Sequence, residues 1–432
     1  MMAEAALDVW LYGTLIARLR RDTPRLRLEW TPQATDRWPI NSTVLSVLLP
    51  ITPEQPPHPA RVRAFFAGLM PEGDARTHLA VDAGVAADDV FGMMKAYGRD
   101  VAGALIIQPE GSGEPSLERT VRPISDREIL EKLIRADANA APLGVIPGVT
   151  SISLAGVQPK IALRLGADGQ WLECLDGAAS THILKPGRPA ESPVADLIYN
   201  EAFCLELAKY LGLTTIDAEV QRFAGFDALV VSRYDRVVTG GHVVRRHQED
   251  CAQMLGLNTD DPMRKFQYGM ALPSLRRIAE VLSQEYAPQL PLLELTALNI
   301  VLGNTDAHAK NISVLHHEDG SLELAPGYDL SPHRHYPSSG NRSAMDVNGV
   351  QDIDAITVAD LMAEGMSWGL RGPAARGAVV SILERTQVWL ALTSEVLAPT
   401  RSRVPDLVLE TLNRRVTNLL SGAGAGAEVA AS

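Results

Sequence analysis

The spacing of apolar residues divides the chain into a mixed N-terminal part and a mostly helical C-terminal part. Up to residue 236, short apolar runs of strand length alternate with stretches of helical spacing, and beyond it helical spacing prevails. The predicted strands are 7–15, 44–50, 161–165, 171–175, 181–186, 218–223, 228–232, 312–315 and 321–325. The predicted helices are 60–69, 90–97, 125–135, 194–211, 248–257, 272–285, 292–302, 358–366, 374–397 and 406–420. The pattern therefore predicts an α/β (α+β) chain.

Breaks in this pattern indicate where one unit ends and the next begins. Residues 109–120 are rich in Pro, Gly, Ser and Glu, a composition typical of linkers, and the loose sequence continues to residue 150. The last twelve residues are small and polar, so we expect them to be disordered. The predicted units are an N-terminal α/β subdomain at 1–108, a linker at 109–150, a strand-rich small lobe at 151–236, a helical lobe at 237–420 and a disordered tail at 421–432.

A polar loop follows the predicted helix 292–302 and carries the densest set of groups able to bind a metal phosphate. Asp306 and Asn311 stand five residues apart, and Asp329 stands just past the predicted hairpin. An aspartate that can accept a hydroxyl proton, followed by an asparagine and a second aspartate that can bind Mg²⁺, is the layout of a protein-kinase catalytic centre. Taken alone, the Asp306–Asn311 spacing is also typical of a turn, since both residue types bond their own backbone.

Parts that would complete such a centre lie upstream in the order that a protein kinase requires. Loop 153–160 leads into the predicted hairpin 161–175, as a loop that covers nucleotide phosphates does. Lys185 ends an apolar strand and Glu201 lies near the middle of the next helix, and kinases use such a pair to hold the α- and β-phosphates. Residues 233–236 then leave the last strand as a hinge whose backbone could contact adenine.

Composition and charge narrow the class of partner. The net charge of −12 over 432 residues argues against a protein that binds nucleic acid unaided, because phosphate binding needs a basic face. Cys174, Cys204 and Cys251 show no C-x-x-C spacing, so we expect buried thiols rather than disulfides or zinc ligands. No apolar run has the length of a membrane span and the first residues lack a secretory pattern, so we expect no membrane association and a cytoplasmic location.

Taken together, the motifs resemble one family, the HipA-type serine/threonine-protein kinase toxins of bacterial type II toxin-antitoxin pairs. The matching segments are 153–160 (SLAGVQPK), 181–185 (THILK), 200–201 (NE), 233–236 (RYDR), 247–250 (HQED), 303–311 (GNTDAHAKN) and 328–330 (YDL). Residues 66–73 and 98–104 resemble the N-terminal subdomain of the family. The resemblance implies a two-lobed, protein-kinase-like fold with an N-terminal α/β subdomain and a mostly helical C-terminal lobe.

The resemblance also implies roles for individual residues, with ATP and Mg²⁺ as cofactors. Asp306 would be the catalytic base, and Asn311 and Asp329 would bind Mg²⁺. Lys185 would bind ATP phosphate with Glu201 as its partner. The other residues implied at the nucleotide site are Ala155, Gly156, Val157, Gln158 and Lys160 of the phosphate loop, Ser232, Arg233 and Tyr234 at the adenine, and His308 and Lys310 of the loop after the helix.

Ser153 resembles the serine at which this family phosphorylates itself, which would eject the phosphate loop and inactivate the enzyme. Added phosphate charge beside a loop that holds ATP phosphates would repel both the loop and the nucleotide. Ser151 lies two residues earlier, on the same side of an extended chain, and is a second candidate.

The resemblance implies a toxin that binds a helix-turn-helix antitoxin (HipB-like), reaches DNA only through that antitoxin and causes growth arrest and persistence. Its implied protein substrate is an aminoacyl-tRNA synthetase, glutamyl-tRNA synthetase in the best-known members. Two alternatives stay open. One is a small-molecule kinase, and the other is a non-catalytic subunit that binds an antitoxin as a co-repressor. The presence of Lys185, Asp306, Asn311 and Asp329 argues against the second.

Overall fold

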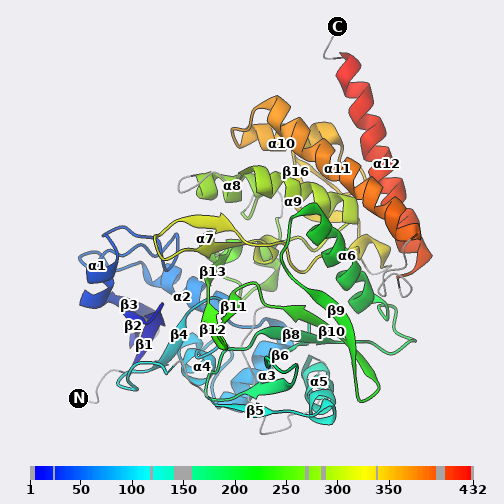
Figure 1. The fold of residues 1–432 in the computed structure, drawn as a ribbon. Coiled ribbons are helices and arrows are strands. Elements are labelled where there is room, and N and C mark those ends of the chain that lie inside the picture. The colour runs from blue at the N-terminus through cyan, green and yellow to red at the C-terminus, as the bar shows by residue number, and fades with distance from the viewer. Residues whose placement is uncertain are drawn as a thin grey trace.

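The computed structural model describes most of the chain, and Figure 1 shows a helical layer above two sheets. The described residues are 5–22, 25–116, 120–140, 158–267, 272–283, 289–336, 339–395 and 404–429. Three clusters of buried apolar side chains form separate cores, one in the N-terminal unit, one against the larger sheet and the largest in the helical part. This mixed α/β architecture confirms the fold class that the sequence predicts.

The N-terminal unit is an antiparallel four-stranded sheet, in the order β3-β2-β1-β4, with helices packed on it. Its strands are β1 (Ala6–Leu11), β2 (Thr14–Asp22), β3 (Arg25–Trp30) and β4 (Ile106–Pro109), and its helices are α1 (Pro32–Arg37), α2 (Pro59–Gly68), α3 (Gly73–Ala83) and α4 (Val90–Tyr97). Phe65 and Phe66 of α2 pack edge to face in its core. The predictions of α2 and α4 are confirmed, whereas α1 and α3 were not predicted.

Two strand predictions in this unit are wrong. Residues 7–15 are not one strand but the start of the β1–β2 hairpin, because Tyr12 and Gly13 both have positive φ and turn the chain. Residues 44–50 form a largely buried loop instead of a strand. The carboxylate of Glu249, from the helical part of the chain, accepts hydrogen bonds from Ser46 Oγ (2.5 Å) and Val47 N (3.1 Å), so these polar groups are satisfied without a neighbouring strand.

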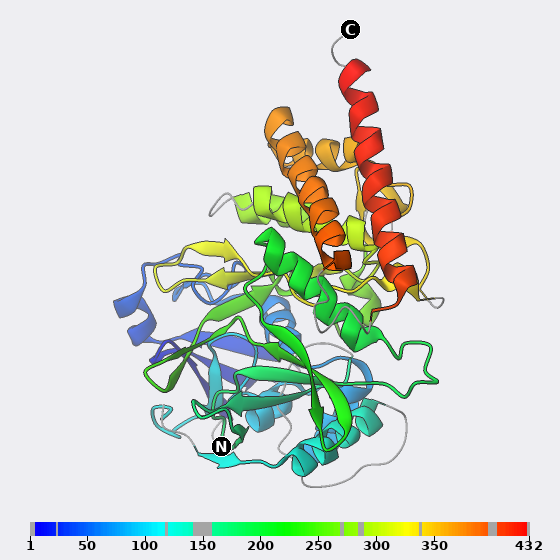
Figure 2. The ribbon, with the colours of Figure 1, turned by 45° about the vertical axis from the view of Figure 1, so that its right-hand side comes forward.

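The small lobe is built on a six-stranded sheet in the order β5-β7-β6-β8-β10-β9. Its strands are β5 (Val121–Pro123), β6 (Ile161–Leu165), β7 (Trp171–Cys174), β8 (His182–Pro186), β9 (Ala218–Phe223) and β10 (Phe226–Ser232), and its helices are α5 (Asp126–Ala140) and α6 (Leu197–Leu211). Figure 2 shows α6 between this sheet and the helical layer. Part of the segment predicted as a linker therefore belongs to the lobe, since β5 extends the sheet and α5 buries Ile129 and Leu133 against it.

The C-terminal lobe is mostly helical. Its helices are α7 (Cys251–Met254), α8 (Leu275–Ser283), α9 (Gln289–Leu302), α10 (Val358–Ser367), α11 (Gly372–Glu395) and α12 (Asp406–Val429), with the 3₁₀ turns η1 (Pro262–Lys265), η2 (Ala309–Asn311) and η3 (His333–His335). Short antiparallel sheets pair β11 (Arg236–Thr239) with β12 (His242–Arg245), β14 (Ser313–His316) with both β13 (His247–Asp250) and β15 (Leu322–Leu324), and β16 (Arg342–Val347) with β17 (Val350–Asp352). The buried helix α9 packs against α10, α11 and α12 and thereby anchors the polar loop that follows it.

Two helix predictions in this lobe are corrected. Residues 248–250 are not helical but belong to β13, which pairs with β14, and the helix begins only at Cys251 after a capping box formed by Asp250 and Gln253. α12 continues to Val429 rather than ending at 420, so it overlaps the segment 421–432 predicted to be disordered. The alanines of that segment favour helix.

The predictions about cysteines and membrane spans can also be compared with the structure. The three cysteines are all buried and free, as the sequence predicts. None of the helices described is long and apolar enough to cross a membrane.

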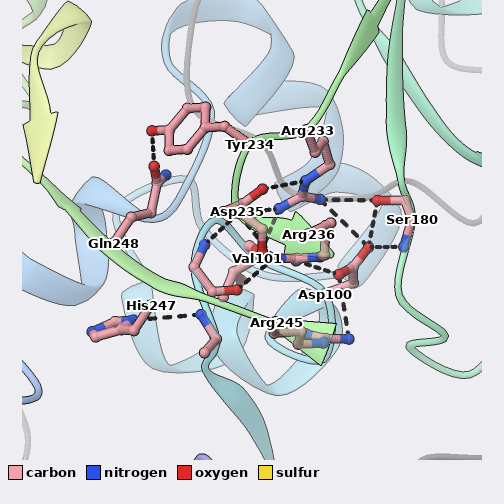
Figure 3. Close-up of polar contacts among 12 residues, drawn as sticks. Asp100, Val101, Ser180, Arg233, Tyr234, Asp235, Arg236, Arg245, His247 and Gln248 are labelled. Carbon is pink, nitrogen blue, oxygen red and sulfur yellow. Dashed lines mark hydrogen bonds and ion pairs between the residues drawn. The ribbon is translucent and has the colours of Figure 1, made fainter. Parts of the chain in front are cut away.

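A buried ion network joins the N-terminal unit to the small lobe (Figure 3). Asp100, from the turn after α4, lies 2.9 Å from Arg236 Nη2 and 3.3 Å from Arg245 Nη2. Asp235 accepts from the guanidinium groups of Arg233 (2.7 Å) and Arg236 (2.9 Å). Although burial opposes ionisation, the guanidinium groups of Arg245, Arg236 and Arg233 hold the pKa of Asp100 below its usual range. The segment 98–104 is therefore the N-terminal side of an interdomain contact.

Removing one partner from this network should destabilise the protein strongly. Asp100→Ala leaves three buried guanidinium groups with too little negative charge, so we expect the free energy of unfolding in urea to fall by about 3–5 kcal/mol. Asp217→Ala is the control, because it breaks a pair with Lys209 in which both side chains are more than half exposed, and it should cost about 0–1 kcal/mol. Equal losses for the two variants would contradict a structural role for the network.

Candidate active site

The polar loop after α9 is fixed by two asparagine side chains. Gly303 takes a positive φ (67°) directly after the helix, a conformation that glycine adopts at little cost. Asn304 donates through Nδ2 to Asn299 Oδ1 (2.7 Å), and its Oδ1 accepts from the backbone N–H of Asp306 (3.1 Å). Neither role was predicted, because an asparagine in or after a helix gives no distinct sequence signal for such a contact. The two side chains thereby fix the position of the Asp306 backbone within the loop.

Asp306 and Asn311 are brought together within this loop. Asn311 Nδ2 donates to the backbone carbonyl of Asp306 (2.9 Å), which engages the amide nitrogen and leaves Oδ1 as the atom able to bind a cation. The carboxylate of Asp306 is 40 % exposed, so a substrate group can reach it. The pair thus presents an exposed carboxylate and an amide oxygen able to bind a cation within one short loop.

Lys185 of β8 forms the centre of the charged cluster that faces this loop. Its Nζ lies 2.6 Å from Glu201 Oε1 of α6 and 2.6 Å from Asp329 Oδ1. Although burial opposes ionisation, the carboxylates of Asp329 and Glu201 raise the pKa of the Lys185 ammonium, so it stays charged. Three elements that are far apart in the sequence therefore converge on one ammonium group.

The two aspartates of the site differ in their electrostatics. Although burial opposes ionisation, the ammonium groups of Lys185 and Lys160 hold the pKa of Asp329 well below its usual range. Among the described residues no cationic group lies at hydrogen-bond distance from Asp306, and burial together with the charge of Asp329 raises its pKa to about 7. Asp329 also has a φ of 55°, a left-handed conformation that is uncommon for a residue other than glycine and often found at functional sites.

Lys310 was predicted to bind nucleotide, but its ammonium group is engaged elsewhere. Its Nζ donates to Asp250 Oδ2 (2.7 Å) and to the backbone carbonyl of Gly68 (3.1 Å), and the side chain is buried. Lys310 therefore ties the loop to α2 of the N-terminal unit. His308 does lie at the site, with Nε2 3.9 Å from Asp306 Oδ1, and burial lowers its pKa well below the usual value, so its imidazole is neutral.

The hinge residues predicted to contact adenine are largely bonded within the protein. The Ser232 N–H donates to the carbonyl of Asp217 (2.8 Å), and the Arg233 N–H donates to that of Thr181 (2.9 Å). The Arg233 side chain lies in the buried ion network of Figure 3, so it does not reach a nucleotide. The Tyr234 hydroxyl donates to Gln248 Oε1.

The predicted phosphate loop is only partly described. Ala155, Gly156 and Val157, like Ser151 and Ser153, lie outside the described residues. Gln158 and Lys160 lead into β6. Burial and the nearby ammonium of Lys185 lower the pKa of Lys160 to about 8. The charges of Asp329 and Glu201 act in the opposite direction, so Lys160 lies within electrostatic reach of the same cluster.

The oxygen donors of Asp329 and Asn311 suit a hard cation whose remaining ligands come from water and from a bound molecule. Asp329 and the Oδ1 atom of Asn311 are oxygen donors of the kind that Mg²⁺ prefers. Over the described part of the chain no group of three or more His, Cys, Asp or Glu could hold a metal ion. A cation at this site would therefore be held by these two side chains, by water and by oxygens of the bound ligand, as Mg²⁺ is held in phosphate-transfer sites.

Comparison with known proteins identifies the family. The HipA N-terminal domain model matches residues 7–108, and the HipA-like C-terminal domain model matches residues 152–389, more than half of the chain. The chain belongs to the HipA family. The protein Y4mE of Sinorhizobium fredii is 31 % identical over 423 residues, which are 95 % of each chain.

A HipA sequence and a solved HipA structure, both from Shewanella oneidensis, are also similar to the chain. The "Serine/threonine-protein kinase toxin HipA" is 29 % identical over 316 residues, 70 % of this chain and 70 % of that protein. The solved structure of a toxin-antitoxin complex of HipA, HipB and operator DNA contains a chain with a TM-score of 0.81 at 24 % identity, covering 97 % of this chain and 98 % of that one. The likeness to that solved structure establishes the fold, and the family is one of kinases.

The raised pKa of Asp306 has a consequence for stability. Between its ordinary value of 3.8 and about 7, the folded protein binds more protons than the unfolded one, so stability falls as pH rises through this range. Asp306→Asn removes this loss. We therefore expect the substitution to raise the free energy of unfolding at pH 8, and to raise it by about 1 kcal/mol more at pH 8 than at pH 5. This figure is reduced for solvent screening, because the carboxylate is partly exposed. The measurement is urea unfolding at the two pH values with a chelator present.

Asp329→Asn is the contrasting variant. It removes a carboxylate that Lys185 stabilises, so it should lower stability at pH 8. If both substitutions raised the free energy of unfolding at pH 8, or both lowered it, the electrostatic difference between the two aspartates would be contradicted.

Proposed function

We propose that this HipA-family chain is an ATP- and Mg²⁺-dependent serine/threonine-protein kinase that acts in the cytoplasm as the toxin of a type II toxin-antitoxin pair. The observation that carries the proposal is the Lys185 ammonium, 2.6 Å from both Glu201 and Asp329, together with the loop that holds Asp306 and Asn311. Kinases use this combination of groups to position the phosphates and their metal. All five of these side chains are present, which disfavours a non-catalytic subunit.

Each residue would have a defined task. Bound Mg²⁺-ATP supplies the phosphoryl group, and the metal neutralises charge that develops during transfer. Asp329 and Asn311 Oδ1 would hold the metal, and Lys185 would bind phosphate oxygens. Asp306 would accept the proton of the substrate hydroxyl, held in place by Asn304 and by the amide of Asn311.

The proposed partners follow from relatives and from charge. The Shewanella complex contains HipA, HipB and operator DNA, and we extend that assembly to this chain as a helix-turn-helix antitoxin of the HipB kind. A net charge of −12 supports contact with DNA only through such a partner. The proposed substrate is an aminoacyl-tRNA synthetase such as glutamyl-tRNA synthetase, on the strength of the motif resemblance.

Phosphoryl transfer tests the proposal directly. The purified protein is incubated with labelled ATP and Mg²⁺, alone and with a cell lysate. Asp306→Asn should lower transfer by roughly 10²–10⁴-fold because the amide cannot accept the proton. Calorimetry should show unchanged binding of Mg²⁺-ATP for this variant and weaker binding for Lys185→Met, which lacks the ammonium. Near-normal transfer by Asp306→Asn would rule out Asp306 as the base.

Self-inactivation is proposed at Ser153, with Ser151 as the alternative. After incubation with ATP, mass spectrometry should find phosphate on the peptide 151–160, and the phosphorylated fraction should bind ATP poorly because its charge repels the triphosphate. Ser153→Ala should lose the modification if Ser153 is the site, and Ser151→Ala should lose it if Ser151 is. Protein that phosphorylates another substrate but carries phosphate on neither serine would refute self-inactivation alone.

A further inference from the structure

Glu72 and Lys265 form a buried ion pair between the N-terminal unit and the catalytic lobe. Lys265 Nζ lies 2.6 Å from Glu72 Oε2, and the two side chains are only 7 % and 3 % exposed. Glu72 is the residue directly before α3, and Lys265 ends η1. Removing two charges from water costs free energy, so a buried ion pair at this place requires an explanation.

A short series of contacts connects the pair to Asp306. The ammonium of Lys265 lies 5.7 Å from the centre of the Phe266 ring, and the centres of the Phe266 and His308 rings lie 5.1 Å apart, with the two rings nearly perpendicular. His308 in turn approaches the Asp306 carboxylate at 3.9 Å. The charges of Lys265 and Glu72 both act on the pKa of Asp306, in opposite directions, which agrees with this placement.

Two further observations separate this pair from a purely structural contact. Glu72 Oε1 is buried and has no hydrogen-bond partner among the described residues, an arrangement that costs free energy in a site that serves only packing. Two other ammonium groups near the loop are held by carboxylates of the catalytic lobes: Lys185 by Glu201 and Asp329, and Lys310 by Asp250. Lys265 is held instead by a residue of the N-terminal unit.

We propose that Lys265 is a further catalytic residue, which contacts the phosphoryl group during its transfer, and that Glu72 is the positioning residue that holds it there. This inference rests on the proposed kinase function. In the transfer, the substrate oxygen bonds to the terminal phosphorus, the bond from that phosphorus to the bridging oxygen breaks, ADP leaves with the electron pair, and the hydroxyl proton passes to Asp306. Lys265 forms no covalent bond and acts through its charge.

The segment 66–73 would then contribute to catalysis, because it contains Glu72. Residues 66–68 end α2, and Glu72 directly precedes α3 and holds the ammonium of Lys265. The N-terminal unit would thus complete the active site of the catalytic lobe. Preorganised positive charge at the point where negative charge develops is among the largest contributions that a protein makes to phosphoryl transfer.

Kinetics of three variants test the assignment. Lys265→Met should lower the turnover number by about 100-fold, with the KM for ATP changed by less than about threefold, because the charge acts mainly in the transition state. Lys265→Arg keeps the charge and should recover part of the loss. Glu72→Gln should give an intermediate loss, since the ammonium stays but is held less firmly. Lys209→Met, at an exposed pair with Asp217, is the control and should be unaffected.

A second readout does not depend on turnover. An ATP derivative whose terminal phosphate carries an acyl group reacts with a nearby lysine amine: the amine attacks the acyl carbon, the bond to the phosphate oxygen breaks, the nucleotide leaves with the electron pair and the proton goes to solvent. Mass spectrometry should find the acyl group on Lys265, and excess ATP should prevent this. Any acylation of Lys209 should be insensitive to ATP.

The outcomes separate this inference from the proposed function. A wild-type protein that transfers no phosphate and binds no Mg²⁺-ATP overturns the kinase proposal and this one with it. A wild-type protein that transfers phosphate, with a folded Lys265→Met variant of equal turnover and no ATP-protected acylation at Lys265, overturns this inference alone. If Lys265→Met fails to fold, Lys265→Arg and the acylation of the wild-type protein decide the question.

Discussion

The structure depends on the requirement that buried charges be paired. Asp100 and Asp235 lie among three arginines in the region where the N-terminal unit meets the hinge of the small lobe, and neither side can withdraw without leaving charge unpaired in the interior. The network therefore fixes the orientation of the N-terminal unit. This orientation in turn decides which of its residues can reach the catalytic loop, and the pairing of Glu72 with Lys265 depends on it.

The same principle holds the loop after α9 against the N-terminal unit. Lys310 connects the loop to Asp250 and to the last carbonyl of α2, while Gln253 Nε2 donates to Phe65 O (2.8 Å) in the same helix. A side chain at Gly68 would collide with Gln253, since a Cβ there would lie 2.5 Å from its Cγ atom. The close approach of α2 and α7 thus requires a glycine, and Lys310, which resembles a ligand from sequence alone, connects the loop to α2.

The sequence predicts well wherever local pattern decides structure. The strands β6 and β9 and the helices α2 and α4 carry clear apolar spacing, and the order of Lys185, Glu201, Asp306 and Asn311 could be interpreted because kinase chemistry constrains it. Long-range contacts escaped prediction. β13 has the spacing of a helix because its partner strand β14 lies some sixty residues further along the chain. Arg233 resembles a ligand although its carboxylate partner Asp235 is only two residues away, whereas Lys310 resembles one because its buried partner Asp250 is distant in the sequence. The pair of Glu72 and Lys265 escaped for the same reason.

The arrangement at the site is costly for the free protein. Lys185 is shared between two carboxylates, and Asp329 has a left-handed backbone conformation. In addition, the negative charge of Asp329 helps to raise the pKa of Asp306. Such costs persist only where the surrounding structure fixes the geometry. Here the three apolar cores, the ion network around Asp100 and the pair of Glu72 and Lys265 do so. A bound cation would neutralise Asp329 and remove much of the repulsion that acts on Asp306. Ligand binding would then stabilise the folded chain by more than its own contacts provide, because it also relieves strain that the rigid frame has imposed.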